Sequence, residues 1–161
     1  MNENELKWLC KHHIHIAPYF NSVCAVDTLP NIILKKPCFL ICNSDKSYQV
    51  GSHWLLIILR VGEVYPIWFD SLGKTPSEYN SLFESFLFKH GKKYIRNSFK
   101  YQSPTSDKCG QFCLYVADLV CRGISFPTAL NVFDKTDLSK NDDIVNYFFE
   151  HHFLYLKKPV E

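Results

Sequence analysis

The chain has 161 residues, of which 47% are hydrophobic, 16% aromatic and 21% charged, a composition that is typical of a globular protein and excludes a disordered tail. The length suits one domain with its own hydrophobic core, so we predict a single domain over residues 1–161. The 18 Lys and Arg residues nearly balance the 16 Asp and Glu residues, and a net charge of +2 excludes any argument from charge alone for a nucleic-acid or membrane partner.

The sequence contains seven cysteines and no stretch with the length and apolar character of a signal peptide or a membrane span. We therefore expect an intracellular protein without a membrane partner, in which an odd number of cysteines favours free thiols over a disulfide framework. Cys109 is the candidate for a reactive thiol. The sequence assigns no role to the other six, which are Cys10, Cys24, Cys38, Cys42, Cys113 and Cys121.

The first half of the chain is predicted to supply the main strands. A short amphipathic helix over residues 3–10 precedes an irregular stretch that extends to Pro37. Apolar runs at residues 38–42 and 53–60 have the length and composition of strands buried on both faces, and residues 64–70 are rich in strand-forming side chains. These three runs predict consecutive central strands.

The second half is predicted to supply most of the helices. Thr75, Pro76 and Glu78 form a capping box that opens a helix ending at Gly91, and a short strand is expected at residues 99–102. The buried face of this helix is expected to comprise Tyr79, Leu82, Phe83, Phe86 and Leu87. Further helices are predicted over residues 109–122, 126–133 and 140–152. This order of elements predicts an α+β fold.

Cys109 lies where a turn-rich loop over residues 103–107 enters a predicted helix. Unpaired N–H groups and the helix dipole favour a thiolate at such a position, and the thiolate is the nucleophilic form. The Cys109 N–H can face a developing oxyanion, while Gly110 would let a substrate chain approach the backbone. A cysteine considered alone is more often a small buried apolar residue, so this assignment depends on its neighbours.

His53 begins one predicted strand and Asp70 ends the next. If Val61-Gly62 forms a two-residue loop, His53 lies directly opposite Asp70, with Cβ atoms about 4.5–5.5 Å apart, and the carboxylate can orient the imidazole. If the loop is Gly62-Glu63 instead, the position opposite His53 moves to Leu72 and the pair with Asp70 becomes diagonal. The sequence does not decide between these two registers. The alternative to a catalytic role is that His53 is a solvated histidine at the end of a strand.

Gln102 precedes the loop that leads to Cys109, and its uncharged NH₂ group suits a second oxyanion donor. A single glutamine in a loop is usually just solvated. A thiol, an imidazole, a carboxylate and an amide in one chain are nevertheless the groups that acyl transfer through a cysteine requires.

Read together, these residues resemble the family of adenain, the cysteine endopeptidase of adenoviruses, and its relatives encoded by Polinton-type transposons. The motifs are GSHW at residues 51–54, WFDSLG at 68–73 and QSPTSDKCGQFC at 102–113, in the family's order. The interval of seven residues from Gln102 to Cys109 also matches, and the resemblance extends over residues 2–154.

The resemblance implies a papain-like cysteine protease fold of the adenain and SUMO-isopeptidase type, with a central mixed sheet flanked by helices and the nucleophile at a helix N-terminus. It implies Cys109 as nucleophile, His53 as base, Asp70 as the orienting acid and Gln102 as oxyanion donor. It further implies that three neighbours line the substrate site, namely Trp54 beside the histidine, Gly51 and Gly110.

The sequence also departs from adenain in two respects. The adenovirus enzyme has Glu at the acid position, where this chain has Asp70, as the transposon relatives and the SUMO-specific isopeptidases do. Adenain is stimulated by a viral peptide through a disulfide, but no cysteine lies between Cys42 and Cys109 here. We expect that the chemistry needs no cofactor. A peptide activator would have to bind without that disulfide. Adenain also uses DNA as a cofactor, but a net charge of +2 gives only weak support for DNA binding by this chain.

These implications favour an endopeptidase that matures structural precursor proteins of a virus or virus-like element at small-residue, Gly-type sites. We expect a monomer that acts in the host nucleus or cytoplasm and in the virion. The same residues serve isopeptidases of ubiquitin-like proteins and related acetyltransferases, because fold and catalytic groups do not fix the substrate. Two non-protease alternatives stay open, a metal site among Cys10, His12, His13 and His15 and a redox pair of Cys109 with Cys113.

Overall fold

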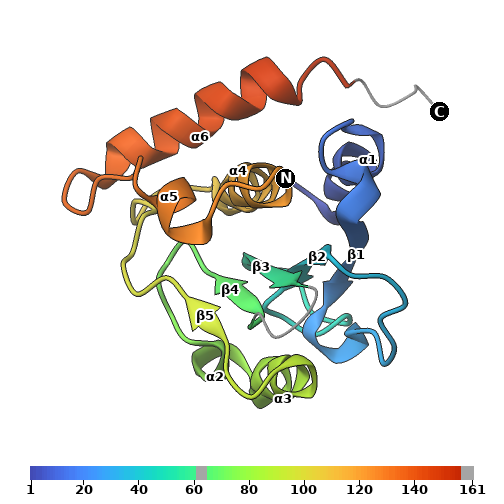
Figure 1. Ribbon diagram of the computed structural model, residues 1–161. Coiled ribbons are helices and arrows are strands. Elements are labelled where there is room, and N and C mark those ends of the chain that lie inside the picture. Colours follow the sequence, from blue (N-terminus) through green and yellow to red (C-terminus); the bar gives the residue numbers. More distant parts are fainter. Residues whose placement is uncertain (61–64, 157–161) are drawn as a thin grey trace.

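The structure is a computed structural model that describes residues 1–60 and 65–156, and a five-stranded mixed sheet lies at its centre (Figure 1). The strands follow one another across the sheet in sequence order. β1 and β2 are parallel, β2, β3 and β4 are antiparallel, and β4 and β5 are parallel. The strands are β1 (Phe20–Ala25), β2 (Cys38–Asn43), β3 (Trp54–Leu59), β4 (Ile67–Phe69) and β5 (Ile95–Arg96).

Helices cover both faces of this sheet, and Figure 1 shows α1, α4, α5 and α6 on one side and α2 and α3 on the other. The helices are α1 (Glu3–His12), α2 (Pro76–Tyr79), α3 (Ser81–His90), α4 (Cys109–Cys121), α5 (Phe126–Leu130) and α6 (Leu138–His152). Two short 3₁₀ helices, η1 (Ala17–Tyr19) and η2 (Val26–Thr28), flank β1. The predicted α+β fold with a central mixed sheet between helices is therefore confirmed. No helix among the described residues is both long and apolar enough to span a membrane.

Two hydrophobic cores explain why the central strands are continuous apolar runs. Every residue of β3 is buried, because side chains alternate between the faces and both faces are covered. Leu56 and Ile58 belong to the core beneath α4, whereas Leu55 and Ile57 belong to the core beneath α3. Burial of each such side chain stabilises the fold by about 1.5–3 kcal/mol.

The sequence prediction misplaced two strands. β1 lies within the stretch predicted to be irregular, because only Val23 and Cys24 of this strand are buried and its apolar pattern is short. The strand predicted at residues 99–102 is absent, and β5 forms earlier in the chain beside β4. The N–H groups of Tyr101 and Gln102 instead donate to the carbonyl of Ser71, at 2.8 and 3.0 Å.

The helix predicted between Pro76 and Gly91 is two helices. Asn80 adopts an extended conformation, with φ −167° and ψ 138°, and its side chain accepts a hydrogen bond from the N–H of Leu82, so a new helix begins there. This break turns Leu82 outward, where it is 46% exposed rather than buried. The helix end before Gly91 is confirmed.

The register between β3 and β4 also decides between the two predicted arrangements. Leu56 pairs with Phe69, and continuing this register by three residues places Leu72 opposite His53. The directly opposed pair of His53 and Asp70 is therefore wrong, and the diagonal alternative is correct. The predicted turn itself lies outside the described residues.

Candidate active site

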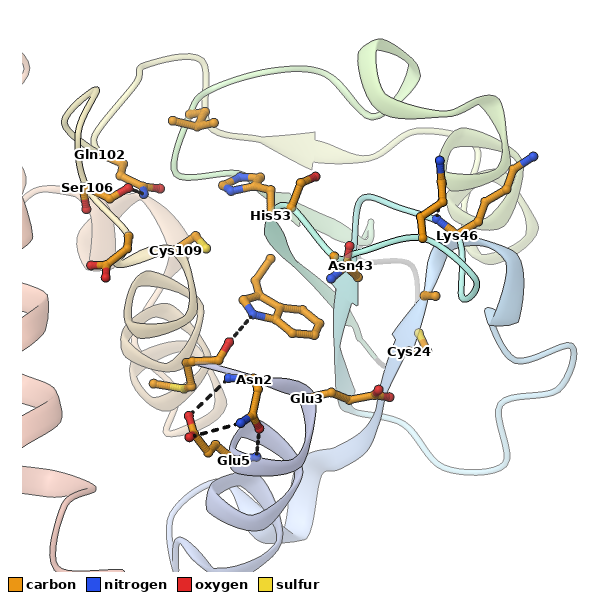
Figure 2. Close-up of a pocket in the computed structure, with 18 of the residues that line it drawn as sticks. Asn2, Glu3, Glu5, Cys24, Asn43, Lys46, His53, Gln102, Ser106 and Cys109 are labelled. Atoms are coloured by element: carbon orange, nitrogen blue, oxygen red, sulfur yellow. Dashed lines mark hydrogen bonds between the residues drawn. The ribbon is translucent and has the colours of Figure 1, made fainter.

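A groove of about 1000 Å³ opens beside Cys109, and segments from distant parts of the chain form its walls (Figure 2). The N-terminal segment, with Met1 and Glu3, forms one wall. The residues that lead into β3, including His53, form a second, and the loop that ends at Cys109 forms a third. A thiol and an imidazole from distant parts of the sequence thus share one open groove.

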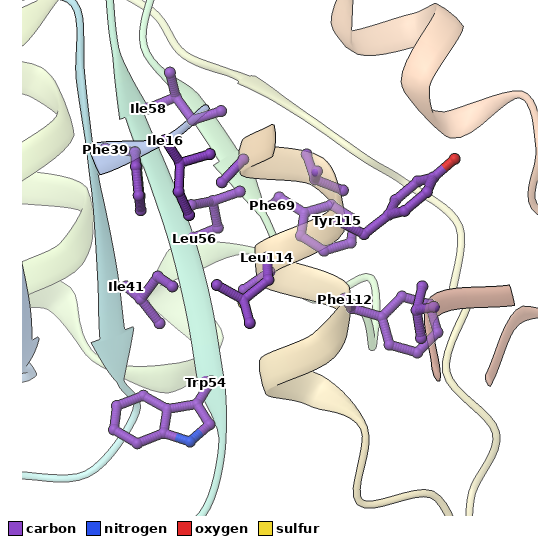
Figure 3. Packing of buried hydrophobic residues seen from close by; sticks show 14 of the residues in the cluster. Ile16, Phe39, Ile41, Trp54, Leu56, Ile58, Phe69, Phe112, Leu114 and Tyr115 are labelled. Carbon is purple, nitrogen blue, oxygen red and sulfur yellow. The ribbon is translucent and has the colours of Figure 1, made fainter. Parts of the chain in front are cut away.

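The packing of α4 on β3 holds these two groups together. Side chains from β3, such as Leu56 and Ile58, lie in one core cluster with Phe112 and Leu114 of α4 (Figure 3). His53 immediately precedes β3 and Cys109 is the first residue of α4. Because a close-packed core deforms little, the ends of the strand and the helix that it joins are fixed relative to each other.

Cys109 is poised to be a thiolate. Burial opposes its ionisation, but the hydrogen bond and charge of His53, followed by the backbone N–H groups of Trp54 and Gly110, lower its pKa below the ordinary value of 9.0. The N-terminus of a helix adds unpaired N–H groups and a favourable dipole. Cys113, one turn further along α4, is buried, and burial raises the pKa of its thiol. Only the first of these two thiols therefore has the environment of a nucleophile.

Asp70 orients the imidazole of His53. Its Oδ1 lies 2.6 Å from Nε2 of His53, although the two residues are diagonal rather than opposed, because both lie just beyond the ends of their strands. The ring is thus held by one nitrogen, leaving Nδ1 for the thiol. Burial lowers the pKa of His53, but the hydrogen bonds with Asp70 and Cys109 outweigh it and raise this pKa to about 9.

The carboxylate of Asp70 is itself surrounded by donors. It is completely buried, and Oδ1 also accepts from the N–H of Leu72 at 3.0 Å. Oδ2 accepts from the N–H of Lys74 at 2.9 Å and from the hydroxyl of Tyr79 at 2.6 Å. Burial raises the pKa of Asp70, yet the bonds from His53 and these donors lower it overall. The carboxylate therefore stays ionised without exposure to water.

The backbone around Asp70 is fixed by two further features. The amide of Asn97 accepts from the N–H of Asp70 at 3.0 Å and donates to its carbonyl at 2.6 Å. Gly73 follows in the left-handed region, with φ +73°, where a Cβ would lie 2.8 Å from the backbone of Phe99. The WFDSLG motif is thus a tight turn that only glycine can complete without strain.

Gln102 lies against this turn and lines the same groove as Cys109, and it is 4% exposed. Its Nε2 donates to the carbonyl of Ser106 at 2.8 Å, and its Oε1 accepts from the hydroxyl of Ser71 at 2.6 Å. The other N–H of this amide has no hydrogen-bond partner within residues 1–60 and 65–156. The structure therefore places His53, Cys109 and Gln102 in the lining of one groove, with Asp70 buried behind His53.

The three predicted lining residues are placed differently from one another. Trp54 and Gly51 line the groove, and the indole N–H of Trp54 donates to the carbonyl of Met1 at 2.9 Å. Gly110 is buried and does not belong to the lining of the groove. The side chain of Met1 covers it, 3.4 Å from the position that a Cβ on residue 110 would take. The expected approach of a substrate chain to Gly110 is therefore not what the structure presents.

Several residues of the site were not predicted from the sequence. The sequence pattern predicts Tyr79 only on a buried helix face, yet its ring stacks 5.8 Å from that of His53 and its hydroxyl donates to Asp70. Asn97 and the N-terminal segment carried no recognisable signal. Ser71 belongs to the WFDSLG motif, but the sequence pattern predicts no role for it.

The residues considered for a metal site do not converge. Within residues 1–60 and 65–156, no three His, Cys, Asp or Glu side chains are close enough to hold a metal ion. His12 stacks on Trp8, and its Nδ1 bonds to the carbonyl of that residue at 2.8 Å. His13 is buried against Phe153.

The pKa values predict the pH dependence of labelling by iodoacetamide. Because the pKa of Cys109 lies below 9.0, its alkylation at neutral pH should be faster than that of an ordinary cysteine, and it should slow as pH drops through that lowered pKa. Cys121, in the last turn of the same helix, should stay unlabelled near neutral pH, since burial raises its pKa to about 12. Peptide mapping by mass spectrometry measures each rate. Equal labelling of the two cysteines would contradict the prediction.

The same mapping must separate the label on Cys109 from label on Cys24, which also lines the groove. The side-chain hydrogen bond with Cys42 lowers the pKa of Cys24. The Cys109→Ala variant provides the control, because only the Cys109 peptide should disappear from the fast phase.

Comparison with known proteins gives a match in structure and not in sequence. No protein-family model matches the chain, and no curated protein sequence matches it. The ASFV pS273R protease superposes with a TM-score of 0.62 at 14% identity, over 94% of this chain. The chain spans 66% of the length of that protease. A yeast structure, the C-terminal Ulp1 protease domain in complex with Smt3, superposes with a TM-score of 0.49 at 13% identity, over 98% of this chain and 78% of that one. The predicted cysteine-protease fold is thereby confirmed: the chain has the fold of the ASFV pS273R protease.

Proposed function

We propose that this chain is a cysteine-type endopeptidase. One observation carries the proposal: the imidazole of His53, held by Asp70 at 2.6 Å, meets the thiol of Cys109 at the N-terminus of α4 inside an open groove. The raised pKa of His53 and the lowered pKa of Cys109 both favour an imidazolium–thiolate pair. This pair is the reactive state of a cysteine protease.

The reaction would proceed in two steps. The thiolate of Cys109 attacks the scissile carbonyl, while the free N–H of the Gln102 amide and the backbone N–H of Cys109 stabilise the oxyanion. The imidazolium of His53 then gives its proton to the leaving amine, and the acyl-enzyme forms. Water, deprotonated by the now neutral His53, attacks the thioester and releases the acid.

We propose a protein substrate, and more narrowly the structural precursor proteins of a virus or virus-like element, cleaved at small-residue, Gly-type sites. The motifs shared with adenain-type proteases support this choice, as does the fold match to the protease of a virus. Cleavage would need no cofactor, with an activating peptide or DNA acting only as a stimulator. The enzyme would act as a monomer, without a membrane partner, in the host nucleus or cytoplasm and in the virion.

A cleavage assay tests the substrate class. Purified protein should cleave a peptide library preferentially at small-residue, Gly-Gly-type sites, and the reaction should stop when Cys109 is alkylated. Probes made from ubiquitin-like proteins are run in parallel. Consumption of the probes without cleavage of free peptides would favour an isopeptidase. Reaction with neither substrate would count against a peptidase of either kind.

A further inference from the structure

Gln102 can serve as an oxyanion donor in only one of its two amide orientations. The side chain carries an acceptor oxygen on one side and a donor NH₂ on the other, and a rotation of 180° about its last bond exchanges them. The exchanged form would present a lone pair to a developing negative charge and would repel it. The site therefore needs a device that fixes this amide.

The contacts of Gln102 identify this device. The carbonyl of Ser106 can only accept, so the group facing it at 2.8 Å must be the NH₂ of Gln102. The Oε1 of Gln102 then faces the hydroxyl of Ser71 at 2.6 Å, and Ser71 donates to it. The two contacts agree on one orientation, with one N–H still available to a substrate.

Ser71 is well placed to enforce that orientation. It is 1% exposed, and Gln102 is 4% exposed, so water does not compete for either group. The backbone joins them a second time, because the N–H of Gln102 donates to the carbonyl of Ser71 at 3.0 Å. Ser71 is also the chain neighbour of Asp70, whose carboxylate holds His53. A single rigid turn thus supports both the imidazole and the amide.

We propose that Ser71 is a positioning residue that holds the amide of Gln102 with its NH₂ directed at the oxyanion, so that the Asp70-Ser71 pair aligns the base and the oxyanion donor together. The inference rests on the proposed peptidase function. An oxyanion donor acts mainly in the transition state, so its misalignment lowers kcat and leaves KM nearly unchanged.

The test compares Ser71→Ala with Gln102→Ala and the double variant. Loss of an oxyanion donor costs about 10²–10³ in kcat, and loss of its alignment by Ser71→Ala should cost about 10- to 100-fold. The double variant should match Gln102→Ala within about twofold, because residues that act as a unit are not additive. Ser85→Ala, an exposed serine of α3, is the matched control and should behave as the wild type.

Alkylation by iodoacetamide separates this role from damage to the triad. Alkylation needs the thiolate of Cys109 but no oxyanion donor, so its rate and pH profile should be the same in Ser71→Ala as in the wild type. A parallel fall of alkylation and turnover would overturn the proposal, as would a wild-type kcat or a double variant whose losses multiply. If Ser71→Ala fails to fold, Ser71→Cys, which keeps a weaker S–H donor, replaces it. An intermediate kcat then supports the proposal, and a wild-type kcat overturns it.

A measurement that does not depend on turnover distinguishes failure of this inference from failure of the proposed function. The side-chain ¹⁵N–¹H resonances of Gln102 are identified by their loss in Gln102→Ala. They should shift and exchange faster with solvent in Ser71→Ala, even if the wild type cleaves no peptide at all. Unchanged resonances would overturn the positioning role while leaving the peptidase proposal intact.

Discussion

Replacement of Cys109 by alanine is expected to abolish peptide cleavage without unfolding the protein. Removal of the proposed nucleophile would take away the covalent step, and in enzymes with a comparable triad the loss reaches about 10⁶-fold in kcat. The free energy of unfolding should change by less than about 1 kcal/mol, because the side chain lies at the open end of α4 and alanine suits the first turn of a helix. Cleavage assays and thermal unfolding measure the two quantities.

The matched control is Cys121→Ala, at the other end of the same helix. This variant makes the same chemical change outside the lining of the groove. It should therefore retain wild-type turnover. Measurable turnover by Cys109→Ala above the uncatalysed rate would refute the assignment of the nucleophile. A large loss of stability in Cys109→Ala would make the activity result uninformative about chemistry, and in that case the pH profile of alkylation in the wild type decides the question.

Much of this site could be predicted from the sequence because its groups lie at the ends of strong local signals. A chemically distinctive residue stands at the start of each element, His53 before the apolar run of β3 and Cys109 as the first residue of α4. The turn that carries Asp70 includes Gly73, which has a positive φ. Glycine adopts this conformation without strain, so a glycine at this position indicates a tight turn from the sequence alone.

The parts that failed depend on contacts between distant segments. The β3–β4 register is set by how two strands pack between two cores, and a one-residue change in the turn shifts every pair. Tyr79 and Asn97 reach Asp70 only after α2 and the segment behind β5 have folded onto the turn. Met1 covers Gly110 for the same reason. Residue type and local sequence pattern do not predict such contacts.

Asp70→Asn is expected to lower kcat by about 10²–10⁴-fold while leaving activity above that of Cys109→Ala. The four groups around the carboxylate are donors in the wild type, two at each oxygen. An asparagine NH₂ at Oδ1 would face the N–H of Leu72, and at Oδ2 it would face the N–H of Lys74. Neither orientation satisfies the site, and the unmatched donor should also cost about 1–3 kcal/mol of stability. Steady-state kinetics and chemical unfolding measure these effects.

The same substitution should move the pH dependence of the thiol in a defined direction. Loss of the carboxylate charge lets the pKa of His53 fall from about 9 toward its ordinary value of 6.5, so the imidazolium that stabilises the thiolate disappears at lower pH. The pKa of Cys109 should therefore rise, and its alkylation by iodoacetamide at neutral pH should slow. Asp143→Asn, at an exposed position of α6, makes the same chemical change away from the site and should leave the profile unaltered. If the profile of Asp70→Asn stays that of the wild type while kcat falls, Asp70 does not act through the charge of His53, and the loss comes from disruption of the turn.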